Sequence, residues 1–197
     1  MTDRRELIAD AAIAVIARSG LRALTHRAVD SELDLPGGST SYYFRTKRAL
    51  LEAAVRHLTE RSRQHFESAT AASEVAPTTD DMARFGAEIL DRLLDERLDD
   101  VRARYALTVE LADDPELHRL LAGSLFSRPR AVELLQALGA TDPDTAGADF
   151  VSVVEGVVFD RFAGARSFDG LTPGTRASID QLAGALGAYL RGAVSAG

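Results

Sequence analysis

The chain of 197 residues is 46% hydrophobic and 27% charged, enough to bury the core of one long domain or two small ones. It has no cysteine, which excludes disulfides and thiolate chemistry, and no tryptophan, which argues against an aromatic-lined sugar or nucleobase groove. Although the net charge is −7, residues 1–65 carry eleven basic against eight acidic side chains, a balance that suits contacts with phosphate.

Hydrophobic residues recur at helical spacing along nearly the whole chain, and no stretch alternates with the two-residue period of a strand. The sequence therefore predicts an all-α fold. A first helix is expected to begin after Asp3 as N-cap and to end at Gly20 in a left-handed conformation. Thr25 caps a second helix that ends near Leu33. After a break, a short third helix is predicted over about residues 36–43.

Thr46 is expected to cap a longer helix. The stretch 68–79 is rich in small and polar residues, which predicts a loosely structured connection. Further helices are predicted over about residues 82–93 and 101–112, and two long ones over 143–164 and 173–193. Residues 66–197 carry twelve basic and twenty-two acidic side chains, a composition that would repel DNA. We therefore expect two domains, an N-terminal three-helix domain over 1–50 and a larger C-terminal helical domain over 51–197.

Three short helices in under fifty residues, the last two joined by a tight turn, match the requirements of a helix-turn-helix. The third helix is short enough to enter a DNA major groove about 12 Å wide. Small residues bring backbone and hydroxyl groups near the bases, tyrosines reach phosphate, and the chain's one lysine adds a cation at a helix start. The predicted DNA-contacting residues are Thr25, Arg27, Gly37, Gly38, Ser39, Thr40, Ser41, Tyr42, Tyr43 and Lys47.

The turn before the third helix has two unusual features. Asp34 is expected to adopt left-handed geometry, which aspartate tolerates better than most residues. Pro36 suits a first helical turn, whereas Gly37 and Gly38 should each weaken the helix by about 1 kcal/mol relative to alanine. No basic residue lies between Asp34 and Phe44, so this segment cannot supply a bidentate arginine contact to guanine.

The run GLRALTHRAVDSELDLPGGSTSYYFRTKRAL, from Gly20 to Leu50, resembles the DNA-binding signature of the TetR family of bacterial regulators. Asp34 departs from that signature, which usually has glycine there. The resemblance implies a homodimer on a palindromic operator in double-stranded DNA, and a C-terminal pocket for an unknown small molecule. The matching positions are Gly20, Thr25, Leu35, Gly38, Tyr42, Tyr43, Phe44, Thr46 and Lys47.

Polar and aromatic side chains on otherwise apolar helices are the candidates for that pocket. They are Phe85, Ile89, Arg104, Tyr105, Thr108, Phe126, Glu155 and Phe159, although each also suits an ordinary core position. Two stripes on the last long helices are candidates for the dimer interface, or for packing within one subunit. They comprise Val151, Val154, Val158 and Phe162 on the first, and Ile179, Leu182, Gly184, Leu186, Gly187, Tyr189 and Leu190 on the second.

No catalytic constellation, metal site or cofactor motif emerges from the sequence. His57, His65 and His118 are isolated and read as surface histidines without carboxylate partners. An acidic cluster reads as a solvated helix face rather than a metal site. Its members are Asp91, Asp95, Glu96, Asp99 and Asp100.

The sequence therefore predicts a cytoplasmic, homodimeric DNA-binding transcriptional regulator, a repressor released by a small-molecule ligand if it follows the TetR pattern. It is not expected to be an enzyme, to need a cofactor or metal, or to contact a membrane, because no apolar run approaches a membrane-spanning length. The alternatives are a helical ligand-binding protein or small enzyme that kept the fold without binding DNA, and a scaffold bundle that binds proteins.

Overall fold

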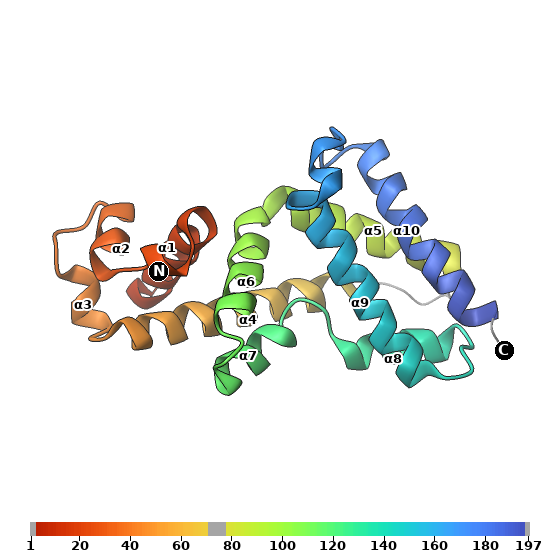
Figure 1. The fold of residues 1–197 in the computed structure, drawn as a ribbon, viewed down its shortest axis with the longest axis horizontal. Helices are drawn as coiled ribbons and strands as arrows, with labels where there is room; N and C mark the ends of the chain where they lie inside the picture. The colour runs from red at the N-terminus through yellow and green to blue at the C-terminus, as the bar shows by residue number, and fades with distance from the viewer. Residues whose placement is uncertain (1–2, 71–77, 196–197) are drawn as a thin grey trace. The chain divides into compact units, whose positions relative to one another are not determined.

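The computed structural model describes residues 3–70 and 78–195, and within them every regular element is a helix (Figure 1). This confirms the predicted all-α fold. No helix in this described part is long and apolar enough to cross a membrane. The chain forms two compact units, one of Met1–Ser68 with Leu98–Leu125 and the other of Ala69–Arg97 with Phe126–Gly197. The predicted boundary at residue 50 falls inside a helix, and as a functional division it stays a prediction.

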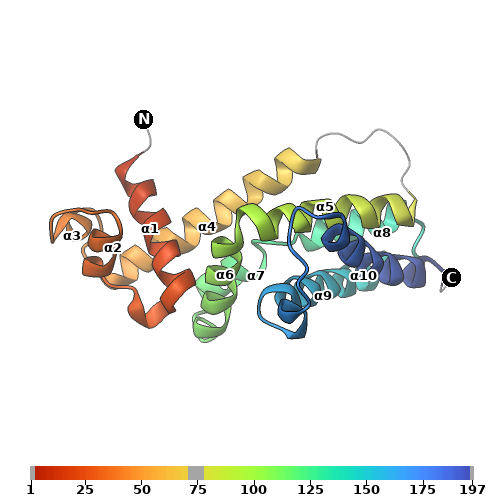
Figure 2. The same cartoon turned by 90° about the horizontal axis from the view of Figure 1, so that it is seen from above.

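The first unit contains the predicted N-terminal helices together with two later ones. Figures 1 and 2 show α1, α2 and α3 gathered around the beginning of α4. The elements are α1 (Arg4–Ser19), a 3₁₀ turn (Leu21–Ala23), α2 (His26–Glu32), α3 (Ser39–Tyr43), α4 (Lys47–Thr70), α6 (Leu98–Glu110) and α7 (Pro115–Ala122).

The caps of these helices follow the sequence closely. Asp3 caps α1 by accepting a hydrogen bond from the Arg5 amide. Gly20 ends that helix with a positive φ of 77°, but its ψ of 170° is extended, so the left-handed helical conformation predicted for it was wrong. Thr25 caps α2, and the apolar residues on either side of the cap, Leu24 and Val29, are both fully buried. This is the hydrophobic staple that fixes the entry of a chain into a helix.

One apolar core joins the helices of the first unit. It takes residues from α1, α2 and α4 and also from α6 and α7, so the small N-terminal helices do not depend on their own residues alone. Phe44, directly after α3, is 7% exposed and anchors the end of that helix to the core. The largest fully buried members are Ile8, Ile13, Ile16, Leu24, Leu50, Leu58, Leu107, Leu117 and Leu121.

The second unit packs its helices in two pairs, α5 with α10 and α8 with α9 (Figure 1). Gly147 lets α8 and α9 approach closely, since a Cβ there would lie 2.7 Å from the Val132 nitrogen. The elements are α5 (Thr79–Glu96), α8 (Arg128–Ala137), α9 (Pro143–Phe162), a 3₁₀ turn (Ala165–Phe168) and α10 (Arg176–Ser195). The predicted connection over 68–79 lies mostly outside the described residues, and α6 begins at Leu98, before the predicted residue 101.

A buried polar cluster ties α5, α9 and α10 together. The Asp91 carboxylate accepts hydrogen bonds from the Ser178 hydroxyl and from the Gly174 amide, the latter at 2.7 Å. The Arg161 guanidinium donates to the Ser178 hydroxyl at 2.7 Å and to the Leu171 carbonyl at 2.9 Å. Asp91 and Arg161 are only 3% and 7% exposed, so this cluster holds the α9–α10 connection from inside the unit.

Candidate nucleic-acid interface

The turn between α2 and α3 is a closed hydrogen-bonded motif. The Asp34 amide donates to the Ser31 carbonyl at 3.3 Å, and the Leu35 amide donates to the Asp30 carbonyl at 2.8 Å. Asp34 has φ of 50°, which confirms the left-handed geometry predicted for it. This pairing is a Schellman motif, in which one left-handed residue lets the backbone close off a helix end.

The Asp30 side chain holds the start of α3 in place. Its carboxylate accepts the Gly38 amide at 2.8 Å, the Thr40 amide at 2.7 Å and the Thr40 hydroxyl at 2.6 Å. Asp30 is 3% exposed, so an α2 residue satisfies the free amides at the beginning of α3 from within the fold. The sequence-based search missed this residue because a lone aspartate on a short helix reads as a solvated side chain.

The hydrogen bonds to Asp30 also set its charge state. Burial alone would raise the pKa of this carboxyl, but the three bonds from Thr40 and Gly38 outweigh it and leave the pKa below its ordinary value. Asp30 is therefore ionised at neutral pH, and its carboxylate oxygens are occupied by the amides and the hydroxyl at the start of α3.

Helix α3 begins at Ser39, not at Pro36 as predicted. Pro36 lies in the preceding turn, where its carbonyl accepts the Ser39 hydroxyl at 2.6 Å. Gly38 is the N-cap with φ of 95°, a conformation that glycine adopts without strain. The expected helix-weakening effect of Gly37 and Gly38 was wrong, because both glycines precede the helix and Gly38 supplies the turn that starts it.

The outer face of α3 presents Ser41 and Tyr42. Tyr42 is 81% exposed. Its ring packs edge-on against the half-buried ring of Tyr43, with 5.2 Å between the two ring centres. Thr40 points the other way: it is fully buried and its hydroxyl is bonded to Asp30. The prediction that Thr40 contacts DNA is therefore corrected, because its side chain cannot reach solvent.

The flanking residues of the predicted interface lie at helix starts. Thr25 is exposed, and its hydroxyl accepts the Ala28 amide at 3.0 Å. Lys47 is the first residue of α4 and its ammonium donates to the Leu21 carbonyl at 3.3 Å. His26, which the sequence search did not select, has its Nε2 2.6 Å from the Phe44 carbonyl and so links α2 to the segment after α3.

Charge is distributed unevenly over the first unit. Arg18 pairs with Glu32, and Arg61 pairs with Asp10 and Asp100, so these carboxylates are neutralised within the fold. The cations around α2 and α3, by contrast, have no carboxylate partner among the residues the structure describes, which leaves their charge available to phosphates. They are Arg4, Arg22, Arg27, Arg45 and Lys47.

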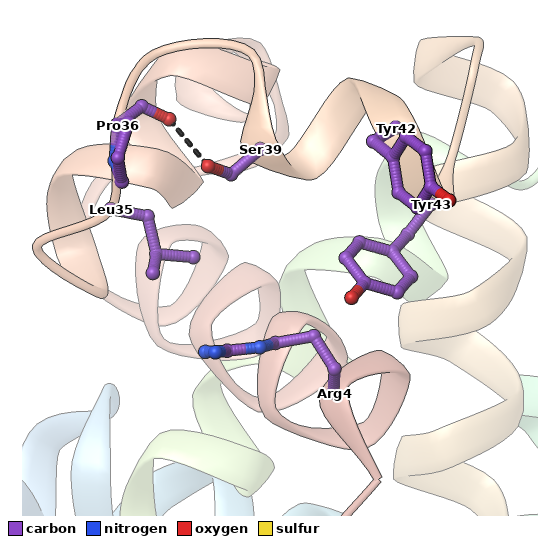
Figure 3. A pocket seen from close by; sticks show the side chains of 6 residues that line it. All are labelled: Arg4, Leu35, Pro36, Ser39, Tyr42 and Tyr43. Atoms are coloured by element: carbon purple, nitrogen blue, oxygen red, sulfur yellow. Dashed lines mark hydrogen bonds between the residues drawn. The ribbon is translucent and has the colours of Figure 1, made fainter.

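A hollow of about 320 Å³ lies between the beginning of α1 and α3. Figure 3 shows the Arg4 side chain extending across it below Leu35, with the Tyr43 ring directed toward Arg4. Its wall combines one cation, apolar surface and hydroxyl groups. The lining residues are Arg4, Leu35, Pro36, Ser39, Tyr42 and Tyr43.

The predicted ligand-binding residues divide between the two units. Arg104, Tyr105 and Thr108 belong to the first, whereas Phe85, Ile89, Phe126, Glu155 and Phe159 belong to the second. Arg104 is 3% exposed, and its Nε donates to the Leu121 carbonyl at 3.2 Å, so it holds the end of α7. Glu155 and Phe159 lie one turn apart on α9, with Phe159 46% exposed.

Two predictions about charged side chains were wrong. His57 has a carboxylate partner, since its Nε2 lies 2.9 Å from Asp10 on α1; the sequence does not show which helices come together. The acidic cluster is not uniformly solvated, because Asp91 and Asp100 are both buried. In the described part of the chain no group of three or more potential ligands is placed to hold a metal ion. The side chain of His65 lies outside the described residues.

A short helix held in a tight turn, with exposed polar side chains and unpaired cations around it, defines a helix-turn-helix DNA-binding unit. Residues 8–54 match the family described as "Bacterial regulatory proteins, tetR family". Residues 77–191 match "Tetracyclin repressor-like, C-terminal domain". The chain belongs to the TetR family of transcriptional regulators, with an N-terminal helix-turn-helix domain and a C-terminal domain like that of the tetracycline repressor.

Solved structures agree with this assignment. A TetR-family member from Streptomyces coelicolor A3 is 26% identical, with a TM-score of 0.71 over 95% of this chain and 98% of that one. The multidrug binding protein EbrR, complexed with malachite green, is 26% identical over 95% and 98% of the two chains, with a TM-score of 0.67. A transcriptional regulator from Rhodococcus sp. Rha1, 20% identical over 98% and 97%, shares the fold with a TM-score of 0.77. The comparison with curated proteins gives no match.

Proposed function

We propose that this regulator binds a palindromic operator in double-stranded DNA as a homodimer, and that it is a repressor released by a small molecule. The observation that carries the proposal is the α3 segment, which Asp30 fixes from inside while Tyr42 and Ser41 face outward among unpaired cations. Two such helices would read half-sites about 34–36 Å apart. We place it in the cytoplasm because the chromosome is its proposed partner, and we assign it no catalytic step.

Replacing Lys47 with alanine is expected to weaken operator binding about uniformly across sequences, because an ammonium at a helix start contacts phosphate rather than bases. The slope of log affinity against log salt should fall by about one. The operator is first isolated by selection from genomic fragments, and affinity is then measured at several salt concentrations for the parent, Lys47→Ala and Tyr42→Phe.

The matched control is Arg63→Ala, which removes one positive charge from α4 at an exposed position paired with Glu60. It should leave the affinity and the salt slope close to those of the parent. If Lys47→Ala and Tyr42→Phe both bind the selected operator like the parent, the assigned contacts are wrong. If the selection retains no fragment at all, operator binding itself is wrong, and a ligand-binding protein or small enzyme without DNA binding becomes the better proposal.

The dimer is proposed to form through the outward faces of α9 and α10. Much of the predicted apolar stripe faces inward instead: Leu186 lies against Gly86, and Gly187 against Ala83, both on α5. Gly156 and Gly184 are exposed, with nothing within 4 Å of the Cβ each lacks, so another helix can approach closely there. The inward-facing residues of the stripe therefore pack within one subunit, which was the alternative to a dimer interface.

The ligand is proposed to be an aromatic cation that binds beside Glu155 and Phe159. EbrR, 26–28% identical to this chain, was solved with proflavin and with ethidium. A carboxylate one turn from an aromatic ring offers such a cation both charge and stacking. We expect ethidium to release the parent from its operator. The Glu155→Gln variant should need a roughly tenfold higher ethidium concentration, because a neutral amide lacks the ionic attraction to the cation, a loss of about 1.4 kcal/mol.

Release is measured by displacement of fluorescent operator DNA during titration with ethidium, corrected for direct binding of the dye to DNA. Glu133→Gln is the matched control, because Glu133 is exposed on α8 and its replacement makes the same chemical change. Equal release of parent and Glu155→Gln would remove Glu155 from the site. No release by ethidium or proflavin would remove the aromatic cation as the ligand class.

A further inference from the structure

The hollow between α1 and α3 has the composition of a site for a small anion joined to an apolar body. Arg4 provides one charge, Ser39 and Tyr43 provide hydroxyl groups, and Leu35 and Pro36 provide apolar wall (Figure 3). At about 320 Å³ it lies at the lower limit for small-molecule pockets, which suits a single sugar–phosphate unit better than a drug-sized ligand.

Arg4 is the cation of this site, and it has no ion-pair partner among the described residues. Elsewhere in the same unit, carboxylates pair with Arg18, Arg48 and Arg61. The nearest carboxylate in sequence, Asp3, is engaged as the N-cap of α1. A guanidinium left free at a hollow lined by apolar surface is suited to bidentate binding of a phosphate.

The hollow also lies beside the surface that faces DNA. Ser39, Tyr42 and Tyr43 belong to α3 itself, so any group in the hollow is next to the helix proposed to enter the major groove. The groups that flank a major groove are the sugars and phosphates of the two strands. This position favours the DNA backbone over a free metabolite as the occupant.

We propose that the hollow lined by Arg4, Leu35 and Tyr43 binds one sugar–phosphate unit of the operator backbone, with the Arg4 guanidinium on the phosphate and the sugar against Leu35 and Pro36. The inference rests on the proposed operator binding and adds the first turn of α1 to the interface. A contact at α1 and another at Lys47 would hold α3 from two sides and so fix its orientation in the groove.

The test compares Arg4→Ala with Arg5→Ala on the selected operator. Arg5 carries the same charge one residue later, but its guanidinium lies 5.3 Å from the centre of the Phe44 ring and does not line the hollow. Arg4→Ala is expected to weaken binding about five- to tenfold and to lower the salt slope by about one, whereas Arg5→Ala has a smaller effect on both. Arg4→Lys should recover part of the affinity, and circular dichroism checks that all variants are folded.

A second measurement locates the contact. Operators with one phosphate replaced by a neutral methylphosphonate are bound to the parent and to Arg4→Ala. One position should weaken the parent but have no further effect on Arg4→Ala. If Arg4→Ala keeps the parent's affinity while Lys47→Ala loses it, the hollow is not a backbone site, although operator binding stands. If neither the parent nor any variant shows specific binding, the proposed function fails and this inference fails with it.

Discussion

Replacing Asp30 with asparagine is expected to abolish specific operator binding and to lower the free energy of unfolding by about 2–3 kcal/mol. The buried carboxylate accepts three hydrogen bonds, two from Thr40 and one from Gly38. An asparagine has only one acceptor oxygen, so its NH₂ group would face the backbone N–H of either Gly38 or Thr40, and two N–H donors cannot bond to each other. The five residues of α3 have too few internal bonds to stay helical without that support.

Stability is measured by urea unfolding, and binding by titration of the selected operator. Asp34→Asn is the matched control, because it makes the same change four residues later, at an exposed position where asparagine also tolerates left-handed geometry. Asp34→Asn should stay within about 0.5 kcal/mol of the parent. An Asp30→Asn protein as stable as Asp34→Asn, and equally able to bind, would show that Asp30 does not hold α3.

The dependence on pH gives an independent check of the same interaction. The folded pKa of Asp30 lies below its unfolded value of about 4, so its contribution to stability is complete above pH 4 and is lost as the pH falls through the folded pKa. The difference in unfolding free energy between parent and Asp30→Asn should therefore be constant from pH 5 to 8 and shrink below pH 4. A difference unchanged down to pH 3 would mean that the asparagine acts by some route other than the lost charge.

Features set by short stretches of sequence were predicted well. The caps at Asp3 and Thr25 and the left-handed Asp34 depend on neighbours within a few residues, and the structure has all three. The start of α3 was misplaced by three residues because Pro36 suits both a first helical turn and the turn before it. The carboxylate of Asp30 decides between the two by taking up the amides of Gly38 and Thr40.

Features that join distant parts of the chain were not predictable. Asp10 contacts His57, and Asp91 contacts Ser178 eighty-seven residues later; no local pattern marks either pair. The same limit applies to the hollow at Arg4, which exists only because the first turn of α1 lies beside α3. Charge counts predicted a basic N-terminal region, but only the ion pairs show which of its cations have no carboxylate partner among the described residues.

The buried cluster in the second unit carries the other large expected effect. Asp91→Asn should lower the free energy of unfolding by about 2–4 kcal/mol, because it removes the negative charge that most favours the charged form of the buried Arg161. Burial already lowers the pKa of Arg161, and the charge of Asp91 opposes that shift. The asparagine would also leave either the Gly174 amide or the Ser178 hydroxyl facing an NH₂ group.

Asp95→Asn separates this effect from a general loss of negative charge, since Asp95 lies one turn later on α5 and is exposed. It should change the unfolding free energy by less than about 0.5 kcal/mol. Ser178→Ala supplies a second comparison: the hydroxyl links Asp91 to Arg161, so its loss should cost about 1–3 kcal/mol without changing any charge. Equal unfolding curves for Asp91→Asn and Asp95→Asn would mean that apolar packing alone holds α5, α9 and α10 together. The polar cluster would then contribute nothing measurable to the free energy of unfolding.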